Sequence, residues 1–351
     1  MRSFADLNRL IGAVPAGVVR RIGEIERAAG QEALLADQLP NLLTGLSHRA
    51  RVESVTASSA IEGIVVEPGR AGRIISGSVS RLRGRSEEEL AGYRDALDYV
   101  FSADPGETTV GLILHVHRLL LGRTPAGGGG LKTADNKVVD RRPDGTTTTR
   151  FDPVSAIEAE VHLAELVDRL GGALVRGEHH RLLLIGLFAL DLLVIHPFAD
   201  GNGRVTRIMT NVQLDQAGFG VGRYVSIEKL VDDTGDAYYD ALAASTVGWF
   251  ADNHDPWPWL GYFVGIVADA YTLFATSVAA ERSRGTKQDR VRDYVVHHAP
   301  VSFTIGDVRR ALPGVSDPTI RVALWALRDA GRIGRVGAGR SARWERLSLA
   351  P

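Results

Sequence analysis

The chain of 351 residues carries 41 Lys and Arg against 42 Asp and Glu, has a formal net charge of −1 at pH 7, and contains no cysteine. The absence of cysteine excludes disulfide bonds, thiolate metal sites and cysteine nucleophiles, and it fits a reducing cytoplasm. With 44% hydrophobic and 24% charged residues, the composition is that of a globular protein of two domains, or of one large and one small domain.

The charge is unevenly distributed along the chain. Residues 282–351 hold 14 Lys and Arg against 6 Asp and Glu, a net charge of +8, which leaves −9 on the residues before them. A basic C-terminal part on an acidic body predicts two separate tasks, and the basic part is expected to face polyanions.

No stretch is typical of a targeting or membrane segment. The N-terminus, Met-Arg-Ser-Phe-Ala-Asp-Leu, lacks the apolar core of a signal peptide. The most apolar run, residues 182–195, is too short to span a bilayer and contains Asp191. We expect this run to be a buried core helix, and we expect no membrane association.

Apolar residues at helical spacing predict that residues 1–105 form an N-terminal helical region. Pro40 suits the start of one helix, and Gly63 suits the position directly after another. The expected helical segments are residues 18–25, 34–39, 40–55 and 87–101.

The central part of the chain begins with a helix and changes in composition after it. A glycine-rich loop over residues 122–130 precedes a strand, a turn and a second strand between Lys132 and Phe151. Asp144-Gly145 between runs of β-branched residues favours a tight hairpin turn. Helices are expected at residues 110–121, 157–170, 181–195, 205–214, 238–250 and 257–280, followed by a linker at residues 281–285.

The densest group of chemically capable residues is the stretch 196–207, His-Pro-Phe-Ala-Asp-Gly-Asn-Gly-Arg-Val-Thr-Arg. Gly201-Asn202-Gly203 comes directly before a predicted helix, where backbone N–H groups can converge at the positive end of the helix dipole and favour a phosphate. Arg204 and Arg207 lie three residues apart on one helix face, and each guanidinium can bind phosphoryl oxygens.

Three further residues of this stretch add functional groups. Asp200 is the nearest carboxylate, and one carboxylate together with substrate phosphates is a usual way to hold Mg²⁺. His196 ends the preceding helix, and its neutral imidazole can take a proton from an attacking hydroxyl. Phe198 is expected to point into the core. Each residue alone also fits a plain tight loop, but the combination favours a nucleotide-binding catalytic loop.

The whole stretch resembles the signature of the Fic-domain family, His-x-Phe-x-(Asp/Glu)-Gly-Asn-Gly-Arg-x-x-Arg, and every fixed position of that signature is filled. The resemblance implies a mostly α-helical Fic fold that transfers AMP from ATP to a Ser, Thr or Tyr hydroxyl of a target protein. It implies that His196 is the general base and that Asp200 binds Mg²⁺. It further implies that Gly201, Asn202 and Gly203 form the anion hole, with Arg204 on the β-phosphate and in the transition state, and Arg207 on the γ-phosphate.

Residues 58–63, Ser-Ser-Ala-Ile-Glu-Gly, resemble the inhibitory-helix motif of the same family, (Ser/Thr)-x-x-x-Glu-(Gly/Asn). The resemblance implies that Ser58, Glu62 and Gly63 belong to an inhibitory helix and that Glu62 pairs with Arg207. An arginine–carboxylate pair competes with an arginine–phosphate pair, so a paired Arg207 cannot hold the γ-phosphate. A plain capped helix end is the alternative interpretation of these six residues.

The family also places a β-hairpin flap over the active site, where the flap holds a target segment by strand addition. The candidate is the hairpin that starts at Lys132 and Thr133, where the family often has Gly-x-(Phe/Tyr)-Arg; an exposed connecting hairpin is the alternative. Tyr239 is expected either to line the nucleotide pocket or to pack between helices. Six histidines without metal-ligand spacing are interpreted as surface or packing residues: His115, His117, His179, His180, His297 and His298.

Residues 282–351 resemble a winged-helix domain, with helices expected at 288–298, 305–312 and 317–330 and a basic hairpin after them. Asp317 suits the N-cap of the third helix, with Pro318 at its first position. Binding of DNA and binding of a protein are both open for this domain. The apolar face of the third helix is Ile320, Leu324 and Leu327, and the residues left for phosphates or bases are Thr319, Arg321, Arg328, Arg335, Arg340 and Arg343.

The sequence therefore predicts three parts. Residues 1–105 are an N-terminal helical region with an inhibitory helix, residues 106–281 are a Fic catalytic core with trailing helices, and residues 282–351 are a winged-helix domain. AMP transfer from Mg·ATP to a target protein, and to the chain itself, is the favoured activity. Removal of AMP by the same site, and a DNA-binding regulator with a nucleotide-sensing Fic domain, are the alternatives. We expect a cytoplasmic protein, and a homodimer is one assembly open to it.

Overall fold

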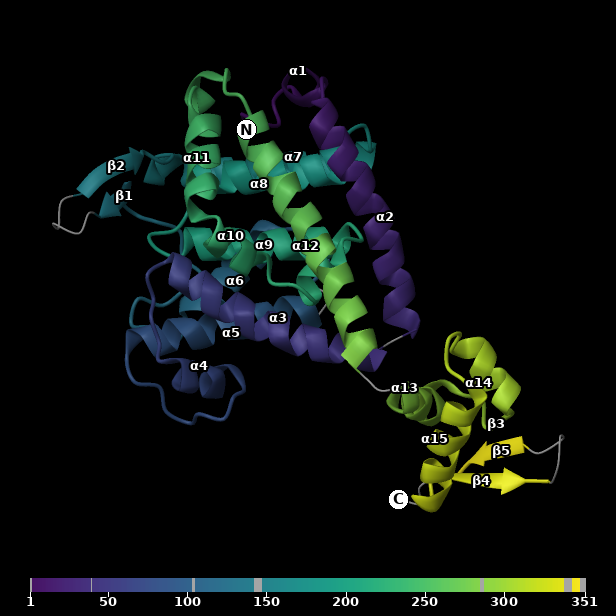
Figure 1. Cartoon of the computed structure of the whole chain (residues 1–351). Helices are drawn as coiled ribbons and strands as arrows, with labels where there is room; N and C mark the ends of the chain where they lie inside the picture. The colour runs from purple at the N-terminus through teal and green to yellow at the C-terminus, as the bar shows by residue number, and fades with distance from the viewer. Residues whose placement is uncertain are drawn as a thin grey trace. The chain divides into compact units, whose positions relative to one another are not determined.

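The computed structural model describes residues 2–38, 40–102, 105–141, 147–284, 287–337 and 343–347. It is mostly α-helical with small sheets, so the predicted mostly α-helical class is confirmed (Figure 1). Contacts divide the chain into two compact units, Met1–Phe274 and Ala275–Pro351, with the boundary inside helix α12 (Trp257–Arg284), which is described with the first unit.

The first unit is a helical body with one β-hairpin. Its elements in chain order are α1 Leu7–Ile11, α2 Ala16–Gln38, α3 Pro40–Ile61, α4 Pro68–Ile75, α5 Arg85–Ser102, α6 Val110–Leu121, β1 Val138–Arg141, β2 Thr147–Phe151, α7 Ala156–Arg176, α8 Arg181–Ile195, α9 Asn202–Gln216, a 3-10 turn at Gly220–Arg223, α10 Ile227–Asp233, α11 Gly235–Thr246, a 3-10 turn at Trp249–Ala251, and the long α12 Trp257–Arg284.

Helix α8 is the buried centre of this unit. Its sequence is apolar on all sides, as expected for a helix surrounded by other elements, and 13 of its 15 residues are buried. Helices α7 and α9 pack against it (Figure 1). Gly186 lets α12 come close, because a Cβ at this position would lie 2.7 Å from Leu260 Cδ2. The prediction of a buried core helix at 182–195 is confirmed.

The carboxylate inside α8 ties down the N-terminal segment. Asp191 is fully buried and accepts hydrogen bonds from Ser3 Oγ at 2.5 Å and from Trp249 Nε1 at 2.6 Å. Burial raises the pKa of Asp191 to about 6 despite these bonds. Two segments far from α8 in the sequence are thereby fixed to the helix that ends at the candidate site.

Helix α12 has the length and apolar composition of a membrane-spanning helix. Among the described helices it alone, over Trp257–Glu281, is long and apolar enough to cross a membrane, and half of its most apolar window is buried inside the fold. The core helix of a globular protein meets the same criteria.

Several element boundaries differ from the sequence predictions. The segment expected at 18–25 and the part of the segment expected at 34–39 that reaches Gln38 belong to one helix, α2, and α4 was not predicted. Residue 39 lies outside the described residues. Strand β1 begins at Val138 rather than at Lys132. Helix α12 continues to Arg284, so the linker expected at 281–285 is wrong up to that residue. Gly285 and the Asp144-Gly145 turn lie outside the described residues.

The second unit combines short helices with a three-stranded antiparallel sheet. Its elements after α12 are α13 Lys287–Asp293, which continues as a π-helical turn over Tyr294–His298, β3 Ser302–Phe303, α14 Ile305–Ala311, α15 Asp317–Asp329, β4 Ile333–Val336 and β5 Arg343–Arg346, with strand order β3-β5-β4. Strand β3 was not predicted. The core of this unit includes Val291, Phe303 and Trp344. The order of the elements is the one that a winged helix requires, and the winged-helix assignment stays a prediction.

The third helix predicted for residues 282–351 is α15, and its expected apolar face is buried. Ile320, Leu324 and Leu327 all lie in the core of the unit. The N-cap is Ser316 rather than Asp317, because the Asp317 carboxylate is bound by Arg309 at 2.5 and 2.8 Å and belongs to the first turn. Most residues expected to face phosphates are exposed: Arg321, Arg328, Arg335 and Arg343. Thr319 is partly exposed, and Arg340 lies outside the described residues.

Candidate active site

The stretch 196–207 turns the chain sharply between α8 and α9. His196 caps α8 in the left-handed region, with φ of 50°, and its backbone N–H donates to Leu192 O at 3.0 Å. Gly201 has φ of 82°, a conformation that side chains with a Cβ rarely adopt. The side chain of Asn202 closes the loop, accepting from Phe198 N at 2.9 Å and donating to Phe198 O at 2.8 Å. Phe198 is fully buried, as predicted.

Helix α9 begins earlier than the sequence predicted, at Asn202 rather than at Val205. The backbone N–H groups of Asn202, Gly203 and Arg204 therefore belong to the first turn, where a helix has no internal acceptor for them. They lie at the positive end of the helix dipole and can bind an anion. Asn202 contributes its backbone to this position, because its side chain is engaged with Phe198.

His196 is placed as a neutral base. Its Nδ1 lies 3.2 Å from Leu193 O, and because a carbonyl can only accept, Nδ1 carries the proton and Nε2 keeps its lone pair. Burial lowers the pKa of His196 to about 4, although the Leu193 carbonyl, Glu62 and Asp200 act in the opposite direction. The imidazole is therefore uncharged and able to accept a proton at neutral pH.

A cavity of about 220 Å³ joins this loop to α11 and to the hairpin. It brings together residues from four separate segments of the chain. They are Glu62 after α3, Val138, Arg150 and Phe151 of the hairpin, Leu193, Val194, His196, Ala199, Asp200, Gly201, Asn202, Gly203 and Arg207 of α8, α9 and their connection, and Tyr238, Tyr239, Leu242, Ala243 and Thr246 of α11.

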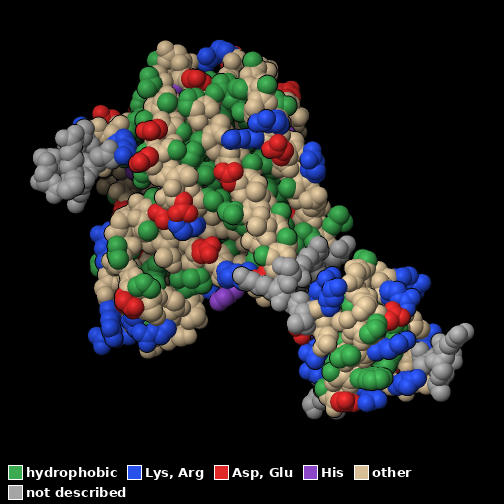
Figure 2. Space-filling model, in the orientation of Figure 1, with side chains coloured by type: hydrophobic (Ala, Val, Ile, Leu, Met, Phe, Trp, Pro, Cys, Tyr) green, Lys and Arg blue, Asp and Glu red, His purple; other side chains and the backbone are tan. Residues whose placement is uncertain are grey.

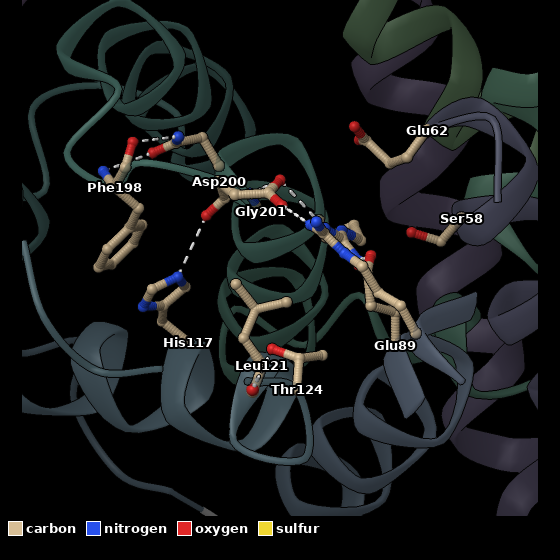
Figure 3. Close-up of polar contacts among 12 residues, drawn as sticks. Ser58, Glu62, Glu89, His117, Leu121, Thr124, Phe198, Asp200 and Gly201 are labelled. Carbon is tan, nitrogen blue, oxygen red and sulfur yellow. Dashed lines mark hydrogen bonds and ion pairs between the residues drawn. The ribbon is translucent and has the colours of Figure 1, made fainter. Parts of the chain in front are cut away.

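Asp200 and Arg204 are held in a closed ring of four charges. Arg204 Nη1 donates to Glu89 Oε2 at 2.5 Å, and Glu89 also pairs with Arg85. Arg85 Nη2 then donates to Asp200 Oδ2 at 2.6 Å, and Arg204 Nη2 reaches Asp200 Oδ1 at 3.3 Å. Glu89 belongs to α5 and Asp200 to the loop before α9 (Figure 3). Arg204 and Glu89 are almost fully buried, whereas the side chain of Arg85 is 63% exposed, so Arg85 is the member that can leave most easily.

Arg207 is engaged by the segment that ends α3. Its Nη2 donates to Glu62 Oε1 at 2.7 Å, and its Nε donates to Ser58 Oγ at 3.0 Å. Figure 3 shows Ser58 and Glu62 on the same side of the loop. Although burial disfavours the charge on Arg207, the Glu62 carboxylate keeps the pKa of the guanidinium above its usual value, so the pair is ionic. A Cβ at Gly203 would lie 2.7 Å from Glu62 Oε1, so only a glycine there lets Glu62 approach undisturbed.

Gly63 ends the segment that carries Glu62. It has φ of 72°, and its N–H donates to Ala60 O at 2.8 Å, while the N–H of Ile64 donates to Ser59 O at 2.9 Å. A left-handed glycine with such bonds is a common helix end. The structure therefore brings Ser58 and Glu62 into contact with Arg207, and Gly63 ends the segment that carries them.

The hairpin contributes residues other than those predicted. Lys132 and Thr133 lie in the loop before β1, and Lys132 is buried. Lys132 Nζ donates to Val154 O at 2.6 Å and to Asn136 Oδ1 at 2.9 Å, so its ammonium fixes the loop instead of reaching towards a target. Arg150 of β2 faces the cavity, with its guanidinium 3.9 Å from the ring centroid of Tyr239. Tyr239 itself lines the cavity, one of the two positions expected for it.

One histidine that sequence reasoning treated as a surface or packing residue supports the loop. His117 of α6 is buried and its ring stacks on Phe198 at 3.7 Å between centroids. The N–H of Gly129 donates to Nδ1 at 2.9 Å, so Nε2 carries the proton and donates to Asp200 O at 3.1 Å (Figure 3). Burial lowers the pKa of His117 to about 4, which keeps this arrangement neutral.

Comparison with known proteins identifies the part of the chain around this cavity. The Fic/DOC family model matches residues 107–214. Residues 107–214 match a Fic domain. A crystal structure of a Fic family protein from Desulfovibrio desulfuricans G20 is similar with a TM-score of 0.65 and 22% identity, over 97% of this chain and 98% of that one. A Fic domain containing signaling protein from Bacteroides thetaiotaomicron is similar with a TM-score of 0.59 and 18% identity, over 76% of this chain and 97% of that one. These likenesses show the fold.

Two curated relatives are similar in sequence. Protein adenylyltransferase fic-1 of Caenorhabditis elegans is 30% identical over 169 residues, which are 46% of this chain and 31% of that relative. The protein of the same name from Caenorhabditis briggsae is 28% identical over 167 residues. The chain thus spans about a third of the length of the curated relatives it matches.

Four residues that contact Asp200, Arg204 or Arg207 lie outside the matched region. Ser58 and Glu62 come from the end of α3, and Arg85 and Glu89 come from α5. The sequence offered a motif for Ser58 and Glu62 but none for Arg85 and Glu89. Glu89 stands in the run Ser86-Glu-Glu-Glu89, which is typical of a solvated helix face, and it is buried only because α5 packs against α9.

Proposed function

We propose that this chain is a protein adenylyltransferase, which transfers AMP from Mg·ATP to a Ser, Thr or Tyr hydroxyl of a target protein and of itself. The single observation that carries the proposal is the cavity in which a neutral His196, the free N–H groups at the start of α9 and Arg207 line one space. A proton acceptor beside an anion site is the minimum that phosphoryl transfer requires.

The transfer step follows from the chemistry of these groups. The target hydroxyl oxygen attacks the α-phosphorus of ATP, and its proton passes to Nε2 of His196. The bond between the α-phosphorus and the oxygen that leads to the β-phosphorus breaks, and pyrophosphate leaves with that electron pair. The backbone N–H groups of Asn202 and Gly203 and the Arg204 guanidinium stabilise the charge that develops on the phosphates.

Asp200 suits a magnesium ion that is shared with the substrate. No cluster of three or more acidic or histidine side chains that could hold a metal exists among the described residues, so the protein alone does not form a full cage. Mg²⁺ commonly takes one carboxylate and completes its shell with phosphates and water, and Asp200 is a half-exposed carboxylate on the cavity wall. Bound Mg²⁺ would neutralise phosphate charge there.

Glu62 is proposed to restrain the activity. While its carboxylate holds Arg207, that guanidinium cannot hold the γ-phosphate, and ATP loses the contact that aligns its α-phosphate with His196. The flap would hold a target segment at the edge of β1 and β2, with Val138, Arg150 and Phe151 facing the cavity.

A second direction of the same chemistry is open because Glu62 and His196 line the same cavity. A water molecule oriented by the Glu62 carboxylate could attack an AMP–protein bond, which would release AMP. Whether AMP transfer or AMP removal dominates is therefore part of the proposal to be tested. The proposal also includes a DNA contact through the exposed arginines of the second unit, a homodimer and a cytoplasmic location.

The proposal is tested by incubating the chain with ATP labelled at the α-phosphate, beside its His196→Ala variant. We expect label on the protein with the native histidine and none with the variant. Purified AMP-modified protein, added to the same two chains, measures the reverse direction. A folded chain that transfers no label and releases no AMP would leave nucleotide sensing as the better account.

A further inference from the structure

The loop between α4 and α5 concentrates positive charge outside the active site. Residues 68–86 contain five arginines and no Asp or Glu. Figure 2 shows basic side chains gathered where Figure 1 places α4 and the loop that follows it. The AMP transfer proposed above assigns no step to these five; Arg85 contacts Asp200 of the active site.

Two of the five arginines are neutralised within the fold. Arg70 binds both oxygens of Glu87 at 2.9 Å, and Arg85 pairs with Glu89 and Asp200. The other three, Arg73, Arg81 and Arg83, are exposed. Among the described residues no ion pair joins their guanidinium groups to a carboxylate, although the backbone N–H of Arg83 donates to Glu87 Oε2 at 2.7 Å. Because the Glu87 carboxylate is already paired with Arg70, positive charge remains in excess here, and a bound anion would reduce the repulsion between the three guanidinium groups.

These three cations surround a hollow rather than point apart. A cavity of about 650 Å³ is lined by Arg70, Arg73, Ser78, Val79, Ser80, Arg81, Leu82, Arg83 and Gly84. Gly77 and Gly84 have φ of 74° and 89°, and these two left-handed residues turn the loop back towards α4. Arg70 Nη2 donates to Arg81 O at 2.7 Å and Ser78 N donates to Arg73 O at 2.9 Å, so both ends of the hollow are fixed to α4.

The chemistry of the lining selects the kind of anion. Guanidinium groups fork onto phosphoryl oxygens, and the hydroxyls of Ser78 and Ser80 add donors. None of the described residues that line the hollow is aromatic, so it lacks the stacking surface that single-stranded nucleic acids use. It is a single compact hollow rather than a stripe along the surface, which does not suit a duplex.

We propose that the hollow lined by Arg73, Arg81 and Arg83 binds a compact polyphosphate anion, either free or as the phosphate chain of a nucleotide. This site is separate from the cavity that contains His196 and does not depend on AMP transfer. Binding is expected to weaken as salt is added, because the arginines are exposed.

The test is calorimetric titration of the full chain with sodium tripolyphosphate. We compare Arg81→Gln/Arg83→Gln with the native chain and with Arg20→Gln/Arg27→Gln, which removes the same charge from the exposed face of α2. The hollow variant is expected to lose one binding event or to bind at least about tenfold more weakly, while the α2 variant binds as the native chain does. Arg73→Gln tests the same hollow from α4, and melting curves establish that each variant is folded.

Other ligands identify the source of the anion. A nucleoside triphosphate that binds the hollow more tightly than tripolyphosphate assigns it to a nucleotide, and equal affinities assign it to free polyphosphate. Citrate at the same ionic strength is expected to bind at least about tenfold more weakly. The proposal is overturned if citrate binds equally well, if both hollow variants bind tripolyphosphate as the native chain does, or if the α2 variant loses as much binding as they do.

Discussion

Replacing Glu62 by glycine is expected to raise transfer of AMP to the chain itself. In the native chain Arg207 is 8% exposed, and its Nη2 donates a hydrogen bond to Glu62 Oε1 at 2.7 Å. ATP must break this pair before the guanidinium can bind a γ-phosphate. Without the carboxylate, the hydrogen bonds that remain to Arg207 within the described part of the chain are those to Ser58, and its guanidinium can bind the nucleotide.

The size of the effect follows from the type of contact. A hydrogen bond between charged groups contributes about 1.5–3 kcal/mol. Since about 1.4 kcal/mol corresponds to a factor of ten, the variant should transfer AMP roughly 10- to 150-fold faster at limiting ATP. The variant should also be less stable without ATP, because Arg207 is left as a buried charge with a weaker set of partners, and ATP should restore much of that stability.

The assay is transfer from α-labelled ATP to the chain, read at several ATP concentrations, with melting curves for each variant. Glu53→Gln, an exposed carboxylate on the same helix α3, is the matched control and should leave the rate unchanged. Glu62→Gly combined with Arg207→Ala should lose the gain, because the freed guanidinium is absent. An unchanged or lower rate in a folded Glu62→Gly chain would refute the restraint.

Three further outcomes are expected. Asn202→Ala removes both bonds to the Phe198 backbone and should lower the free energy of unfolding by about 2–4 kcal/mol in a urea titration; a loss below about 0.5 kcal/mol would contradict the role of Asn202 in closing the loop. Because burial lowers the pKa of His196 to about 4, its neutral form persists down to that pH. The value of kcat/KM should therefore stay constant on the acidic side until about pH 4 and fall below it, and a fall that begins near pH 6.5 would count against a buried base. Arg85→Gln should lower the Mg²⁺ concentration for half-maximal transfer by up to about fivefold and tighten Mn²⁺ binding, since it removes an exposed cation from Asp200; no change in either would show that Arg85 does not compete for that carboxylate.

Local sequence patterns predicted the parts of the site that lie within one stretch. The structure around residues 196–203 depends mainly on residues that are adjacent in the sequence. The apolar run before His196 and the glycines at positions 201 and 203 therefore predicted the end of α8, the sharp loop and the helix after it. The motif around Glu62 placed a second segment correctly against Arg207, over a separation of 145 positions. The start of α9 was missed because glycine is a poor helix former except near a helix end.

Contacts between distant segments could not be derived from the sequence. His117 joins Asp200 across 83 positions, and Glu89 joins Arg204 across 115 positions. Glu89 carries no local signal of burial, and His117, although it lies at helical spacing from the apolar Ile113 and Leu120, carries no local signal of its partner. Lys132 begins a segment with the residue pattern of a strand and was therefore expected at the flap. Its ammonium instead donates hydrogen bonds to carbonyl oxygens of two other segments, which come together only in the folded chain.

The most direct test of the central claim is the intact mass of the Glu62→Gly chain after incubation with Mg·ATP, beside the same chain with His196→Ala added. The account predicts a gain of one or more AMP units that depends on His196. A folded Glu62→Gly chain that gains no AMP, or that gains it equally without His196, would contradict the account.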